Sequence, residues 1–138
     1  MKEFNELIQK ADFHYDKAYF GRKKQSLSTQ EITDNFGKAM HYWKLAVEFL
    51  LANPTLFDEQ TKAIYCQQAA ATAYECGEFR ECERIIALSL CGNPPVSIAV
   101  NLRKLWQKAL KEINKLPENM LKIRATETKN DKKVALQK

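Results

Sequence analysis

The chain has few residues that interrupt a helix. Only four glycines and four prolines occur among its 138 residues, and most of them stand where a periodic apolar stretch stops. Alternation of apolar and polar residues, which would indicate a half-buried strand, does not occur together with turn residues. These absences favour an all-α fold over one that contains a sheet.

Long apolar runs are missing as well. No stretch approaches the roughly 20 apolar residues that a membrane-spanning helix needs. The first ten residues, MKEFNELIQK, carry charges throughout and lack the apolar core of a signal peptide. We therefore expect no membrane span and a cytoplasmic, intracellular location.

The chain also lacks the residue spacings that metal and catalytic sites require. Its four cysteines form no C-x-x-C pair, and its two histidines show no ligand-like spacing. No G-x-S-x-G, H-E-x-x-H or P-loop pattern is present. Asp12 and Asp16 share a helical face, but so do many carboxylates on solvated helices. We expect a protein that is not an enzyme, with no catalytic residue, no metal and no cofactor, whose cysteines act as small apolar side chains.

Apolar residues recur at helical spacing along most of the chain. We predict five antiparallel helices joined mostly by short turns. Their expected ranges are 2–20, 29–52, a third ending at 76, 78–91, and a fifth that begins near 93 and ends before 117.

Capping residues mark several of these boundaries. Gly21 is predicted to end the first helix, and Ser28 with Glu31 forms a capping box for the second. Gly77 is predicted to close the third helix in left-handed geometry. Asn93 is predicted to cap the fifth helix, with a proline in its first turn.

Basic charge is concentrated at the C-terminal end. The net charge is +5, and residues 117–138 alone hold six Lys or Arg against three Asp or Glu. These residues include few large apolar side chains, which is typical of a flexible segment. We predict one helical domain over 1–116 and a basic, flexible tail over 117–138.

The segment Ala69–Pro95 combines small, aromatic and punctuating residues in a recurring order. Four alanines fall within five residues, followed by a Gly-x-aromatic turn at Gly77 and Phe79. A small residue then stands at Cys82, and a proline at Pro94 ends the unit. This helix–turn–helix pattern of about 34 residues resembles the tetratricopeptide repeat.

A weaker second copy precedes the first. Ala11 and Tyr15 fit its first helix, Ala39 and Trp43 fit its second, and the connection at 21–28 is longer than usual. The fifth predicted helix would then be the C-terminal capping helix that such arrays need. The resemblance implies tetratricopeptide-like α-hairpin repeats over roughly residues 4–115.

The family resemblance also implies a function. Such repeats bind peptides or partner helices in a groove lined by the first helix of each unit, so we expect a non-catalytic adaptor, scaffold or chaperone-like module that binds another protein or peptide. Aromatic and arginine side chains are enriched where interfaces gain binding energy, and here amide side chains flank them. The candidate partner-binding residues are Gln67, Ala71, Tyr74, Arg103, Trp106 and Gln107.

Two further interpretations stay open. The GRKK segment at 21–24, the basic residues of the fifth predicted helix and the tail could bind nucleic acid or another anionic surface, which is the alternative function. Phe13, Phe20 and Phe49 fall outside the main apolar stripes. If they are exposed together, they would mark a surface for self-association.

Overall fold

The structure, a computed structural model, describes residues 1–115, and the tail predicted for 117–138 lies outside them. The described residues form five helices and no strand, which confirms the all-α fold. The helices are α1 (Lys2–Lys24), α2 (Thr29–Ala52), α3 (Glu59–Glu75), α4 (Phe79–Leu90) and a fifth helix over 96–115.

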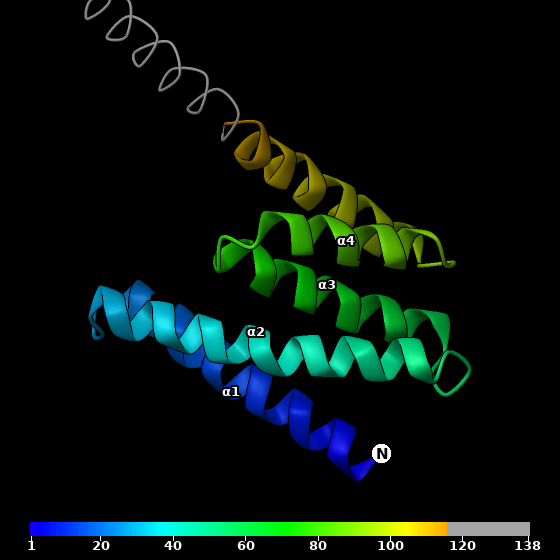
Figure 1. Cartoon of the computed structure of the whole chain (residues 1–138), viewed down its shortest axis with the longest axis horizontal. Coiled ribbons are helices and arrows are strands. Elements are labelled where there is room, and N and C mark those ends of the chain that lie inside the picture. The colour runs from blue at the N-terminus through cyan, green and yellow to red at the C-terminus, as the bar shows by residue number, and fades with distance from the viewer. Residues whose placement is uncertain (116–138) are drawn as a thin grey trace, which may run out of the picture.

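The helices stack in chain order and reverse direction at each turn (Figure 1). α1, α3 and the fifth helix therefore run one way, while α2 and α4 run the other. In the view of Figure 1, α2 and α4 lie toward the viewer, and α1 and the fifth helix lie behind them. Each pair of neighbours along the chain is also a pair of neighbours in space, as short connections dictate.

The core runs through the whole stack and joins large side chains to small ones. Trp43 and Met40 of α2 are fully buried, and so are Ile85 and Ile86 of α4. The buried apolar side chains of α3 are all alanines, Ala63, Ala69, Ala70 and Ala73, and the larger Tyr65 packs against this core while only partly buried. Because alanine lets helix backbones approach closely, the larger side chains of α2 and α4 fill the space on either side of α3.

Aromatic rings close the core near the N-terminus. The ring of Phe4 is fully buried and lies 5.1 Å from Phe49, 4.9 Å from Phe57 and 5.3 Å from Tyr65, measured between ring centroids. These separations fall within the range that aromatic pairs prefer. The cluster ties the start of α1 to the end of α2 and to α3.

The first helix is longer than its sequence suggests. Gly21 was predicted to end it, and this was wrong, because α1 continues to Lys24 and stops at Gln25, which adopts left-handed geometry with φ 56°. Gly21 is buried inside the helix instead. A Cβ atom at that position would lie 2.4 Å from Cδ1 of Leu27. The glycine thus makes room for the loop to fold back on α1.

Two of the predicted boundaries are confirmed. Ser28 Oγ accepts a hydrogen bond from the Glu31 N–H, and the Glu31 carboxylate accepts one from the Ser28 N–H, so the capping box of α2 forms. Gly77 adopts φ 76° after α3. Its N–H donates to the carbonyl of Tyr74, and the Glu78 N–H donates to that of Ala73, which is the Schellman arrangement.

The predicted cap of the fifth helix was wrong by two residues. The carbonyl of Pro95 accepts the first helical hydrogen bond, from the Ala99 N–H, so Pro95 rather than Asn93 precedes the helix. The Asn93 N–H instead donates to the Glu59 carboxylate at 3.3 Å. This bond links the start of α3 to the loop after α4.

Candidate functional site

A hollow of about 200 Å³ opens between α1 and α3, and we call it the α1–α3 hollow. Three of its residues come from α1, two from α3 and one from α2. They are Asp12, Tyr15, Asp16, Gln68, Thr72 and Trp43. Helical spacing explains this grouping, because residues three and four apart share a face, as Asp12, Tyr15 and Asp16 do on α1.

Carboxylates give the α1–α3 hollow a negative character. Within residues 1–115, neither Asp12 nor Asp16 forms a hydrogen bond or an ion pair through its side chain. Burial raises the pKa of Asp12 above its usual value, and the neighbouring Asp16 raises it further. Both effects oppose the ionised form of Asp12, so a cation from outside the chain would relieve them.

The back of the same hollow is aromatic and well packed. Trp43 is fully buried, and the ring of Tyr15 lies 5.5 Å from that of Phe36. Burial raises the pKa of the Tyr15 hydroxyl, and Glu75 adds to the shift. The hydroxyl of the buried Thr72 donates to the carbonyl of Gln68 within α3. The hollow therefore has a well-packed aromatic back and carboxylates along one side.

An ion pair holds α1 and α3 together beyond this hollow. Arg22 Nη1 lies 2.7 Å from Glu75 Oε2, and the Arg22 guanidinium also lies over the ring of Phe36 at 5.2 Å. The hydrogen bond to Glu75 raises the pKa of Arg22. Because Glu75 is engaged in this pair, the charge left without a partner is that of Asp12 and Asp16.

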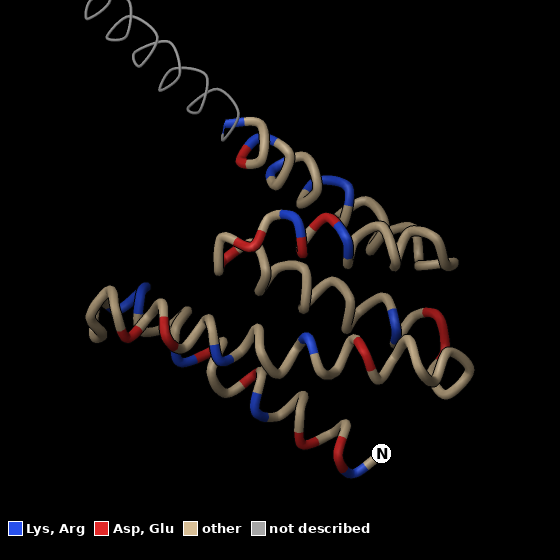
Figure 2. The backbone as a smooth tube through the Cα atoms, in the orientation of Figure 1, with Lys and Arg blue, Asp and Glu red and all other residues tan. Residues whose placement is uncertain are grey.

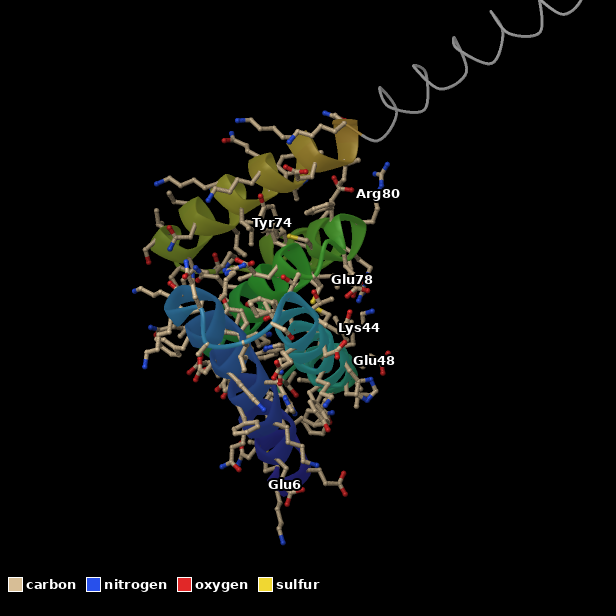
Figure 3. The ribbon with its side chains drawn as sticks, turned by 90° about the vertical axis from the view of Figure 1, so that its left-hand side faces the viewer. Glu6, Lys44, Glu48, Tyr74, Glu78 and Arg80 are labelled. Atoms are coloured by element: carbon tan, nitrogen blue, oxygen red, sulfur yellow. The ribbon has the colours of Figure 1, made fainter. Side chains whose placement is uncertain are left out.

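The predicted residues of α3 all lie on partly buried positions. Gln67, Ala71 and Tyr74 are each half-buried. The ring of Tyr74 packs edge-on against Phe79 at 5.5 Å between centroids. Figure 3 shows Tyr74 between α3 and the fifth helix. This aromatic side chain therefore contributes to packing at the α3–α4 turn as well as to the surface.

The predicted residues of the fifth helix are exposed. Arg103 and Gln107 are exposed to solvent, and the relative solvent exposure of Trp106 is 39%. Trp106 Nε1 donates to the Glu83 carboxylate at 3.0 Å, which places its indole against α4. Trp106 of the fifth helix is thus hydrogen-bonded to α4. The other predicted residues Gln67, Ala71 and Tyr74 belong to α3, and no hydrogen bond joins them to Trp106.

Sequence reasoning missed the residues of the α1–α3 hollow. Asp12 and Asp16 were recognised as a pair on one helical face but were given no role. Gln68 and Thr72 lie one residue after the predicted Gln67 and Ala71, so the predicted stripe on α3 is rotated from the one that lines the hollow. The signal that would have found them is a carboxylate pair that flanks an aromatic residue on the first helix.

Other hollows lie elsewhere on the stack, and two of them include residues of α3. One of about 720 Å³ lies between the first half of α2 and the α3–α4 turn, and its rim carries the ion pair of Lys44 Nζ with Glu78 Oε1 at 2.7 Å (Figure 3). The other, of about 150 Å³, lies where the end of α2 meets α3 and α4, and it is mostly apolar. The charges at the rim of the larger hollow are paired with each other.

The chain was compared with family models, curated proteins and solved structures. No family model, no curated protein and no solved structure matches it. Among residues 1–115, no group of three His, Cys, Asp or Glu side chains is arranged to hold a metal ion. In the same range, none of the helices combines the length and apolar character needed to cross a membrane.

Proposed function

We propose that the chain is a non-catalytic interaction module of the adaptor or scaffold type, similar to tetratricopeptide repeats. It binds a peptide or partner helix of another protein on the side of the stack where α1, α3 and the fifth helix lie. The observation that carries this proposal is the α1–α3 hollow, whose carboxylates bind nothing within residues 1–115. The parallel course of these three helices supports it.

The chemistry of the hollow favours a basic partner. Asp12 and Asp16 would accept hydrogen bonds from a lysine or arginine side chain, and charge-assisted bonds of this kind are stronger than neutral ones. Gln68 offers an amide donor and acceptor to the partner backbone. Tyr15, backed by the buried Trp43, supplies an apolar surface for the methylene groups of a long cationic side chain. A peptide with Lys or Arg is the expected ligand class.

Selection from a random displayed-peptide library on the full chain tests this proposal. We expect enrichment of peptides that contain Lys or Arg. The double variant Asp12→Asn with Gln68→Ala should bind the selected peptide about tenfold more weakly, since hydrogen bonds to charged groups contribute about 1.5–3 kcal/mol. Fluorescence anisotropy with a labelled peptide gives the affinity.

Glu48→Gln is the matched control, because it removes an exposed carboxylate on the other side of the stack (Figure 3). It should leave the affinity unchanged. A second variant, Tyr74→Ala with Arg103→Ala, tests the residues predicted from the family resemblance. If no peptide is enriched, or if every variant binds equally well, the peptide-binding proposal is wrong.

The alternative function, binding of nucleic acid or another anionic surface through the basic loop and tail, is supported by the charge of the fifth helix. Figure 2 shows that basic residues predominate there, with Glu112 as the one acidic residue of 96–115. The basic residues are Arg103, Lys104, Lys108, Lys111 and Lys115. An oligonucleotide that binds at low salt, and no longer binds when 117–138 is removed, would favour nucleic-acid binding over the peptide proposal.

A further inference from the structure

Two phenylalanines of α1 point away from the rest of the stack. The relative solvent exposure of Phe13 is 62%, and that of Phe20 is 49%. They are two helical turns apart, so they lie one above the other on the same face. Each follows a fully buried alanine, Ala11 or Ala18, by two positions, which places it on nearly the opposite side of the helix.

The aromatic face formed by Phe13 and Phe20 lies at the N-terminal end of the stack. None of the helices in residues 1–115 covers it. The other end differs, because the fifth helix packs there and buries Leu102 and Ala109 completely. Phe49, which the sequence grouped with these two phenylalanines, packs against Phe4 and is not part of the face. Large exposed aromatic side chains that recur on one helical face indicate an interaction surface.

The two charges midway between the rings, Asp16 and Lys17, are self-complementary. Asp16 and Lys17 lie midway between Phe13 and Phe20 along α1, one on each flank of the aromatic face. Neither forms an ion pair with another residue of 1–115. A two-fold axis parallel to α1 would exchange the two flanks. It would bring Asp16 of each copy beside Lys17 of the other, while equivalent phenylalanines meet at the centre.

We propose that this face binds a second copy of the chain and forms a symmetric dimer with the two α1 helices parallel. The rings of Phe13 and Phe20 form the apolar centre, and the Asp16–Lys17 pairs at the edges fix the direction. An antiparallel pairing would place Asp16 beside Asp16 and Lys17 beside Lys17, which like-charge repulsion disfavours. Asp16 also lines the α1–α3 hollow, but Phe13 and Phe20 do not, and the test of the dimer contains no peptide, so the two proposals can fail separately.

Sedimentation equilibrium of the full chain over a wide concentration range tests the dimer. We expect the native chain to be dimeric at high concentration. Phe13→Ser with Phe20→Ser should be monomeric at the same concentrations, with an unchanged far-ultraviolet circular dichroism spectrum. The matched control is Leu51→Ser with Val96→Ser, which removes apolar side chains of 50% and 81% exposure elsewhere and should stay dimeric.

A charge exchange tests the parallel arrangement. Lys17→Asp should weaken the dimer about tenfold, because each copy then presents acidic side chains to the other on both flanks. Adding Asp16→Lys to this variant restores opposite charges across the interface and should restore the native dissociation constant. A native chain that remains monomeric, or a dimer that survives the loss of both phenylalanines, overturns the proposal. A double exchange that fails to recover the dimer overturns its parallel geometry.

Discussion

Gly21 and Gly37 both lie inside helices, yet their surroundings differ. Gly21 is buried under Leu27, whereas a Cβ atom added at Gly37 would meet nothing within 4 Å. Glycine inside a helix costs about 1 kcal/mol relative to alanine, because the unfolded chain loses more freedom. At Gly37, no neighbouring side chain requires the absence of a Cβ atom. At Gly21, the absence of the Cβ atom leaves the space that the Leu27 side chain occupies.

Alanine substitution should separate the two glycines. Gly37→Ala is expected to raise the free energy of unfolding by about 1 kcal/mol. Gly21→Ala should not give this gain, because the new methyl group displaces the Leu27 side chain from its packed position. Chemical denaturation of both variants measures the difference. Equal stabilisation by the two substitutions would show that the packing of the Leu27 side chain does not require glycine at position 21.

The start of α3 depends on one carboxylate. Asp58 precedes the helix, and its Oδ1 accepts a hydrogen bond from the Thr61 N–H at 2.7 Å. This bond lowers the pKa of Asp58 below its usual value. A lowered pKa in the folded state means that the ionised form stabilises the fold. The positive end of the helix dipole acts in the same direction.

We expect the contribution of Asp58 to be present above about pH 4, near the ordinary pKa of aspartate, and to be lost as the pH falls through its lowered value. Asp58→Asn keeps a cap oxygen but removes the charge. Its thermal midpoint should therefore fall less between pH 7 and pH 3 than that of the native chain. Thermal melts at the two pH values give the comparison. An equal fall in both proteins would assign the acid sensitivity to other carboxylates.

At the scale of the elements, much of the fold could be predicted because its signals are local. The capping box at Ser28 and the left-handed Gly77 involve residues close in sequence, and both predictions are confirmed. The end of α1 could not be predicted, because Gly21 serves a contact with Leu27 that depends on how the loop folds back. Glycine has two uses in a helix, and the sequence does not distinguish them.

The candidate site was harder to predict than the fold, since it depends on the rotation of one helix against another. Periodicity identifies the apolar face of α3, but a shift of one residue on the opposite face separates Gln67 from Gln68. Such a rotation follows from the packing of alanines against α2 and α4, which no pattern in one helix contains. The residues of the hollow therefore emerge only from the assembled stack.

At the scale of the whole molecule, the four cysteines report on different depths of the structure. Cys91 is exposed, Cys66 and Cys76 are half-buried, and Cys82 is fully buried. Burial raises the pKa of the Cys82 thiol to about 11. Burial and the nearby Glu78 raise that of Cys76 to about 11 as well. Cys76 also donates its S–H to the carbonyl of Phe36.

At pH 8, a thiol reagent should therefore modify one cysteine rapidly and three slowly, because the thiolate is the reactive form. Cys91→Ser should remove the fast phase and leave the slow phases unchanged. The rate at Cys82 should rise with denaturant as unfolding exposes the core. The measurement is absorbance during reaction with a disulfide reagent. Two or more fast thiols in the native chain would contradict the packing of α3 against α4.

The stacking of each helix on its neighbour in the chain has a consequence for how the protein forms. Contacts between sequence neighbours keep the relative contact order low, and helical proteins of this kind fold on the microsecond to millisecond scale. The α1–α2 hairpin can assemble before α3 leaves the ribosome, because its capping box and much of its aromatic packing lie within one segment. The packing thus permits assembly in the order of the sequence, from α1 toward the fifth helix.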